Sequence, residues 1–130
     1  MIVDTSALLA ILLKEPEAQL LDVVIANSVD CKMSAANFLE AALVLTARGG
    51  EAGAMDLDLL VARCGIQVVP FTEAQSRMAR LAFARYGKGR HPAQLNFGDC
   101  MAYALAKDTG EELLFKGADF ALTDVAVARY

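Results

Sequence analysis

The chain alternates short apolar runs with longer stretches whose apolar residues recur at helical spacing. The first run, Met1–Val3, is entirely apolar and stops at Asp4, and a helical pattern begins directly afterwards. Runs this short and this apolar are typical of strands covered on both faces of a parallel sheet. Similar runs, the last of which fits an edge strand, lie at residues 31–33, 66–69, 113–115 and 125–127.

The helical stretches between these runs have recognisable ends. Ser6 is a suitable N-cap for the first helix, which should end near Glu15–Pro16 because proline disfavours helix at the preceding residue. Ser34 should cap a long helix that Gly49–Gly50 ends. Further helices are expected at about 17–27, 52–63, 72–86 and 96–109. Strands that alternate with helices predict an α/β fold with a mostly parallel sheet.

The bulk composition narrows the class of protein. A chain of 130 residues with 56% hydrophobic residues fits one globular domain, residues 1–130. We expect no membrane segment and no secretory signal, because no charge-free stretch approaches the roughly 20 residues that a spanning helix needs. The three cysteines are far apart, which fits reduced thiols in a cytoplasmic protein better than zinc ligands or disulfides.

The charges are distributed unevenly along the chain. The net charge of −4 argues against a general nucleic-acid binder. Residues 74–98, however, contain no Asp or Glu and hold five of the twelve basic residues. These five are Arg77, Arg80, Arg85, Lys88 and Arg90. A solvated helix face and loop would explain such a stretch, and so would a surface that holds a phosphate backbone.

Four acids could meet at one edge of the predicted sheet. Asp4 follows the first strand, Asp119 follows the fourth, Asp99 begins a helix, and Glu40 lies within another helix. The carboxyl ends of parallel strands are where open α/β folds bind ligands. Each aspartate also has a structural explanation, since Asp4 and Asp99 could cap helices and Asp119 could be a turn residue.

Glu40 is harder to explain by structure alone. It has no basic residue three or four positions away, and the nearly apolar helix around it predicts burial on most sides. A buried, unpaired carboxylate costs several kcal/mol or takes up a proton, and a bound cation is one remedy. Carboxylates without His or Cys favour Mg²⁺, with Mn²⁺ as a possible substitute. Such ions often act on phosphates, and the absence of a phosphate-binding glycine loop favours a polymeric substrate.

The chain resembles the PIN-domain ribonucleases, specifically the VapC toxins of bacterial type II toxin–antitoxin pairs. The resemblance extends over essentially the whole chain, in order and spacing. It is carried by Met1–Leu8, Ser34–Glu40, Tyr86–His91, Leu95–Cys100, and Leu113–Phe120 followed by Thr123-Asp124. It implies a single PIN domain over residues 1–130, with a three-layer α/β/α fold and a parallel sheet of four to five strands.

The resemblance also implies a function, namely Mg²⁺-dependent hydrolysis of RNA phosphodiester bonds by a metal-activated water. The metal ligands and catalytic residues would be Asp4, Glu40, Asp99 and Asp119. Thr5 or Ser6 would support the first acid or contact the scissile phosphate, and Lys88 and Arg90 would hold RNA. The implied partners are a VapB-like antitoxin and a second copy of the chain. Asp124 matches a recurrent family position whose role stays open.

Two other functional classes remain as alternatives. A structure-specific DNA nuclease would use similar acids, but such chains are generally longer and carry extra acids and a helical clamp. A non-catalytic, receiver-like signalling or binding domain would need paired acids after its first strand and a phospho-accepting Asp after a middle strand. Here a single Asp4 follows the first strand, and Ile66–Val69 runs into Pro70. The sequence does not distinguish tRNA, rRNA or mRNA as the target, because shape and single-stranded context decide it.

Overall fold

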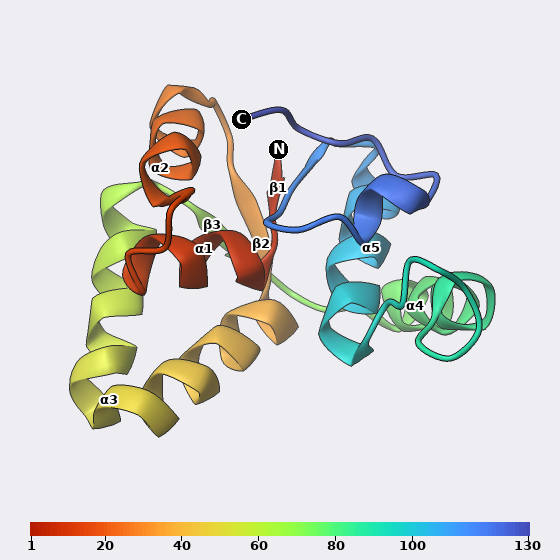
Figure 1. The fold of residues 1–130 in the computed structure, drawn as a ribbon, viewed down its shortest axis with the longest axis horizontal. Helices are drawn as coiled ribbons and strands as arrows, with labels where there is room; N and C mark the ends of the chain where they lie inside the picture. Colours follow the sequence, from red (N-terminus) through yellow and green to blue (C-terminus); the bar gives the residue numbers. More distant parts are fainter.

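A parallel sheet of four strands lies between two layers of helices in the computed structural model, which describes residues 1–130 (Figure 1). The strands are β1 (Ile2–Val3), β2 (Lys32–Ser34), β3 (Gln67–Val69) and β4 (Leu113–Leu114), and their spatial order is β3-β2-β1-β4. The region of the expected fifth strand contributes one parallel bridge, between Leu113 and Val127. The predicted three-layer α/β/α architecture is confirmed.

The five α-helices cover the two faces of the sheet unequally (Figure 1). Helices α1 (Thr5–Leu12), α2 (Ala18–Asn27) and α3 (Ala35–Arg63) form one layer, and α4 (Glu73–Tyr86) and α5 (Phe97–Thr109) form the other. A short 3₁₀ helix, Phe120–Leu122, follows β4. None of the helices combines the length and the apolar character that crossing a bilayer requires.

Helix α3 consists of two arms that meet at a sharp bend, as Figure 1 shows. Gly50 has φ 63° and ψ −153° at the bend, a conformation that glycine adopts without the strain a side chain would cause. The helix end that was expected at Gly49–Gly50 is therefore a change of direction between two helical arms. The second arm returns toward the sheet, where Leu57 and Leu60 are buried.

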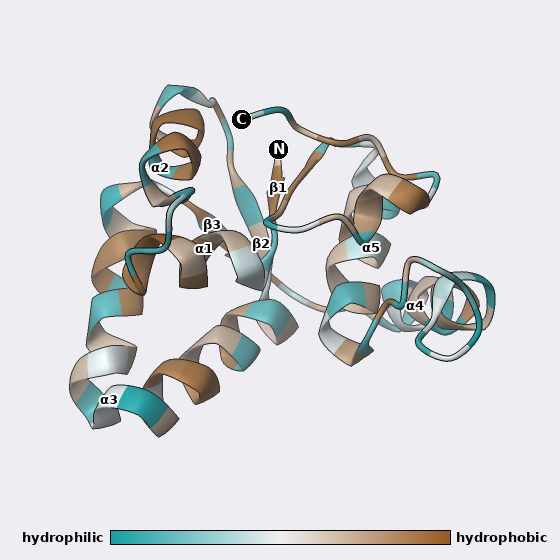
Figure 2. Cartoon of the chain, in the orientation of Figure 1, coloured by the Kyte–Doolittle hydropathy of each residue, from teal (hydrophilic) through white to brown (hydrophobic).

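The alternation of side chains along the central strands divides the interior into two hydrophobic cores. Val3 and Leu114 pack in the core beneath α1, α2 and α3, whereas Ile2 and Leu113 pack in the core beneath α4 and α5. Figure 2 shows that β1 and β4 are hydrophobic along their lengths. Both strands lack polar residues because they are buried on both faces, and the first polar residue after β1 is Asp4.

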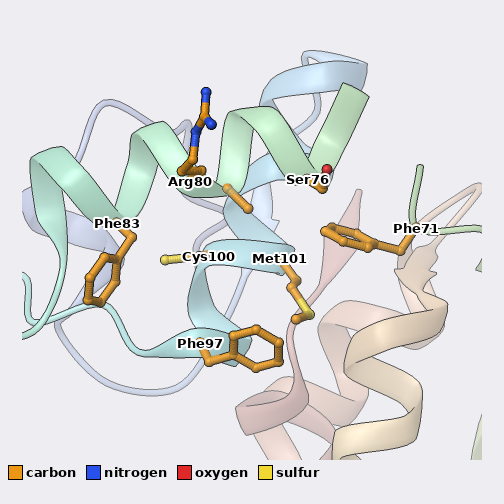
Figure 3. A pocket seen from close by; sticks show the side chains of 8 residues that line it. Phe71, Ser76, Arg80, Phe83, Phe97, Cys100 and Met101 are labelled. Atoms are coloured by element: carbon orange, nitrogen blue, oxygen red, sulfur yellow. The ribbon is translucent and has the colours of Figure 1, made fainter. Parts of the chain in front are cut away.

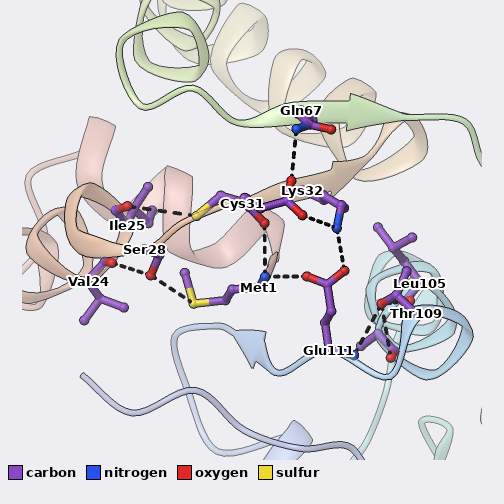
Figure 4. Close-up of polar contacts among 12 residues, drawn as sticks. Met1, Val24, Ile25, Ser28, Cys31, Lys32, Gln67, Leu105, Thr109 and Glu111 are labelled. Carbon is purple, nitrogen blue, oxygen red and sulfur yellow. Dashed lines mark hydrogen bonds and ion pairs between the residues drawn. The ribbon is translucent and has the colours of Figure 1, made fainter.

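An ionic network holds the amino-terminal edge of the sheet together (Figure 4). Lys32 Nζ lies 2.7 Å from Glu111 Oε1 and 2.8 Å from Asp30 Oδ2, and the amino group of Met1 also pairs with Glu111. These contacts connect β1, β2 and the segment before β4. The opposite, carboxyl edge carries the candidate site.

Candidate active site

A cavity of about 190 Å³ lies at the carboxyl edge of the sheet, where β1 ends and α1 begins. Three of the four predicted acids line it, together with polar and apolar neighbours. The lining residues are Asp4, Thr5, Ser6, Leu9, Glu40, Val44, Asn96 and Asp99. The topology thus brings together side chains from α1, α3 and the start of α5, at the position where open α/β folds bind ligands.

Asp4 is fixed at the end of β1 by both its backbone and its side chain. Its N–H donates to the carbonyl of Leu114 at 2.9 Å, and its Oδ2 accepts bonds from the N–H and the hydroxyl of Ser6 at 2.9 and 2.6 Å. Asp4 is therefore the N-cap of α1, and the expectation that Ser6 fills this role is wrong. The helix already begins at Thr5, so the cap falls on the residue before it.

The other oxygen of Asp4 makes the residue unusual. The side chain is 3% exposed, and Oδ1 is buried without any hydrogen-bond partner. Burial raises the pKa of Asp4 from 3.8 to about 6, against the lowering effect of the two Ser6 hydrogen bonds. The negative charges of Asp99 and Glu40 contribute to this increase in the pKa. Capping of α1 therefore accounts for Oδ2 of this carboxylate and leaves Oδ1 without a structural role.

Asp99 is held in the first turn of α5 by a capping box. Its N–H donates to Asn96 Oδ1 at 2.9 Å, and its Oδ2 accepts a bond from the N–H of Asn96 at 2.7 Å. Burial raises the pKa of Asp99, the Asn96 bond opposes this, and the charges of Asp119 and Glu40 add to the increase. The structural explanation proposed for Asp99 is thus correct, and the same bonds orient its carboxylate at the cavity.

Glu40 reaches the cavity from the first arm of α3. Its Oε2 accepts a 2.6 Å bond from the hydroxyl of Thr5 and lies 3.4 Å from Asn37 Nδ2, and no basic side chain pairs with it. A methyl group added at Gly98 would overlap both oxygens of the Glu40 carboxylate. The absence of a side chain at Gly98 therefore lets α5 approach Glu40 closely.

The prediction that the helix around Glu40 is buried on most sides is wrong. Glu40 is half-buried, and its neighbours Leu39 and Leu43 are 57% and 62% exposed. The first arm of α3 packs one face against the core, through Ala41 and Leu45, and leaves a second apolar face uncovered.

The remaining predicted residues lie outside the cavity lining. Asp119 is exposed at the start of the 3₁₀ helix, although its charge contributes to the raised pKa of Asp99. Lys88 and Arg90 are exposed in the loop between α4 and α5, and the Arg90 guanidinium lies 5.8 Å from the centre of the Phe83 ring. Asp124 accepts a 2.5 Å bond from the Tyr103 hydroxyl, which anchors the last segment to α5.

The donor set of the cavity fits a hard divalent cation. Three carboxylates and two hydroxyls supply only oxygen donors, and no basic residue lines the cavity. No three carboxylate, thiol or imidazole groups of the chain lie close enough together to enclose an ion. The unpartnered Oδ1 of Asp4 and the mutual repulsion of the acids are the features that a bound cation would relieve.

Comparison with known proteins identifies the family. Residues 1–126 match the PIN domain family. The chain is 52% identical over 126 residues to Ribonuclease VapC of Mycolicibacterium smegmatis. The aligned region covers 97% of this chain and 98% of that protein. Among solved structures, the crystal structure of Mycobacterium tuberculosis VapC20, a sarcin–ricin loop cleaving toxin, has a TM-score of 0.81 at 17% identity, over 99% of this chain and 98% of that one. A toxin–antitoxin complex from Klebsiella pneumoniae has a TM-score of 0.70, also at 17% identity, over 99% and 97%. This chain therefore belongs to the PIN-domain family and, within it, to the VapC ribonucleases.

Proposed function

We propose that this chain is the toxin of a type II toxin–antitoxin pair, an endoribonuclease that cleaves RNA with a divalent cation held at the acid cavity. The observation that carries the proposal is the meeting of Asp4, Glu40 and Asp99 around a cavity with no basic residue. The 52% identity to a ribonuclease, over nearly the full length of both chains, favours this function over a DNA nuclease or a receiver-like domain.

The ligands of the cation would be Asp4, Glu40 and Asp99, with Asp119 as a fourth from the rim. A bound Mg²⁺ or Mn²⁺ would activate a water molecule and neutralise charge that develops on the scissile phosphate. The remaining contribution of the chain is orientation. Ser6 fixes the rotamer of Asp4, and Thr5 directs the Glu40 carboxylate. Both hydroxyls already donate to acids, which favours a supporting role for them over a direct contact with RNA.

We infer that RNA approaches along the acid-free stretch between α4 and α5. Lys88 and Arg90 are exposed in the loop that leads into Asn96 and Asp99, and no carboxylate pairs with either of them. Basic side chains without a carboxylate partner can hold the phosphates of an RNA backbone.

The test is cleavage of total cellular RNA by the purified chain, in Mg²⁺ or Mn²⁺ and in EDTA, with Asp99→Asn beside the parent. The variant keeps the shape and capping ability of Asp99 and removes its charge, so we expect cleavage to fall at least about a hundredfold. Asp108→Asn, at the other end of α5, is the matched control and should cleave like the parent. Equal cleavage by parent and Asp99→Asn, or full cleavage in EDTA, would refute the proposal. A single-stranded DNA substrate tests the DNA nuclease alternative.

We further propose a homodimer formed through an α3–α5 face, defined here as Leu39, Leu43, Phe97 and Met101. Two adjoining cavities of about 460 and 530 Å³ share Phe97 and Met101, and Figure 3 shows Met101 next to Phe71 and Phe97 in the larger one, with Phe83 on its other side. Phe97 is 81% exposed. Leu39 and Leu43 are exposed as well, whereas Met101 is buried in the wall of the cavity that it shares with them, and exposed apolar residues of this kind are typical of protein interfaces. Light scattering should show Phe97→Glu as a monomer and Val29→Glu, at an isolated exposed position, as a dimer.

The antitoxin would bind a second apolar surface, on the far side of the helical layer from the sheet. The exposed apolar residues of α2 and of the second arm of α3 are the candidates for this surface, namely Leu20, Val23, Met55 and Leu59. Arg63 and Asp22, 2.6 Å apart, link these two helices. An apolar segment of the antitoxin could cover this surface, and co-purification of the antitoxin with the parent and its loss with Leu59→Glu would test the assignment.

A further inference from the structure

Asn37 is a buried, uncharged residue that contacts all three helices of the acid cavity. It lies in the first turn of α3, three residues before Glu40, and is 1% exposed. Its side-chain nitrogen Nδ2 lies 3.0 Å from the carbonyl oxygen of Gly98, 3.3 Å from Thr5 Oγ1 and 3.4 Å from Glu40 Oε2. These acceptors belong to α5, α1 and α3.

The contacts of Asn37 connect α5 to the helix that carries Glu40. The carbonyl that it binds belongs to the residue directly before Asp99, so the bond ties the first turn of α5 to the first turn of α3. Gly98, at the same point, leaves the space that the Glu40 carboxylate occupies. The hydroxyl oxygen of Thr5, whose proton is donated to Glu40, also lies 3.1 Å from the backbone carbonyl oxygen of Asn37, which places α1 at the same junction.

A purely stabilising role does not account for this residue. Asn37 Oδ1 is buried without a partner, and a buried amide with one unmet acceptor stabilises a fold less than a well-packed apolar side chain. Gln75 provides the contrast within the same chain. It is 4% exposed, its nitrogen donates to Asp108 at 2.9 Å, and its oxygen completes the capping box of α4.

We propose that Asn37 is a positioning residue that sets the spacing between Glu40 and Asp99 required for cation binding. The inference rests on the proposed metal-dependent function and adds to it a residue that is neither an acid nor a ligand. Partners that orient metal ligands commonly change metal affinity by ten- to a hundredfold when they are replaced.

The main test measures Mn²⁺ affinity directly, so its outcome does not depend on activity. Mn²⁺ is titrated into the parent, Asn37→Leu, Asn37→Ser and Gln75→Leu, and the free ion is measured by electron paramagnetic resonance. The temperature is one at which circular dichroism shows each protein to be folded. We expect a dissociation constant ten- to a hundredfold higher in both Asn37 variants. Gln75→Leu removes an amide that is equally buried but remote from the acids, and should bind Mn²⁺ within about twofold of the parent despite a lower melting temperature.

The outcomes separate the inference from the proposed function. Parent-like Mn²⁺ binding by a folded Asn37→Leu or Asn37→Ser would overturn the positioning role. Asn37→Ser introduces no extra bulk, so it serves where Asn37→Leu fails to fold, and failure of both to fold would also overturn the inference by showing that the amide serves the fold itself. Absence of Mn²⁺ binding by the parent would instead refute the metal site. Steady-state cleavage should show a lower kcat with KM unchanged.

Discussion

Replacing Asp4 with Asn should stabilise the metal-free chain in a way that depends on pH. The carboxylate is 3% exposed, one of its oxygens has no partner, and two further acids lie around the same cavity. The folded chain therefore disfavours the charged form, whereas the unfolded chain does not. Asn keeps the size of the side chain and its ability to cap α1, but never carries the charge.

The magnitude follows from the change in pKa. An increase from 3.8 to about 6 corresponds to roughly 3 kcal/mol between the folded and unfolded states. Between these two values the folded chain binds a proton that the unfolded chain does not, so the stability of the parent falls as the pH rises through this window. Below it Asp4 is protonated in both states and carries no penalty. The advantage of Asp4→Asn should therefore grow by roughly 2 kcal/mol from pH 4 to pH 7.

The assay is urea unfolding of both chains in EDTA, followed by circular dichroism at several pH values. Taking the difference between the two unfolding free energies removes the titration of most other groups and any constant cost of the amide. Asp30→Asn is a control of opposite sign, because the hydrogen bond from Lys32 lowers the pKa of Asp30 and its contribution is lost as the pH falls. A difference for Asp4→Asn that stays flat from pH 4 to pH 7 would refute the reasoning.

Three further predictions concern the metal and two glycines. Mn²⁺ at a hundred times its dissociation constant should add about 2.7 kcal/mol to the unfolding free energy of the parent at pH 7.5, seen as a melting temperature several degrees higher, and Asp4→Asn should lack this gain. Gly98→Ala should lower kcat for RNA about a hundredfold because it displaces Glu40, while thermal unfolding shows stability equal to or above that of the parent, since Ala favours helix. Gly50→Ala should cost about 1–2 kcal/mol in urea unfolding, because Ala disfavours φ 63°, and cleavage by the folded variant should match the parent.

Local signals along the sequence predicted most of the fold. The helices expected at about 72–86 and 96–109 are observed at Glu73–Tyr86 and Phe97–Thr109, with Thr72 and Asn96 as their N-caps and Gly110, with φ 71°, at the end of α5. The run Met1–Val3 followed by Asp4 is a strand with an acid at its carboxyl end. These features depend on neighbouring residues in the chain, so they can be recognised without knowledge of tertiary contacts.

Two features of the site could not be predicted in this way. Leu39 and Leu43 have the same pattern as buried residues, because an apolar face that meets another chain and one that meets the core are identical in sequence. Asn37 carries no charge, and although it lies within the Ser34–Glu40 motif, its only individual signal was its position one turn before Glu40. Its contacts with Thr5 and Gly98 span 32 and 61 positions of the chain, so only the folded structure reveals them.

The pairing of β1 has a consequence for the order in which the protein becomes active during synthesis. The strand that ends in Asp4 is made first, yet the bond from the Asp4 N–H goes to Leu114 and the register of Ile2 is completed by Leu113. A nascent chain shorter than this lacks one of the two neighbours of its central strand and also lacks Asp99 until late. The proposed acid site therefore stays incomplete during synthesis until the residues of β4 have left the ribosome.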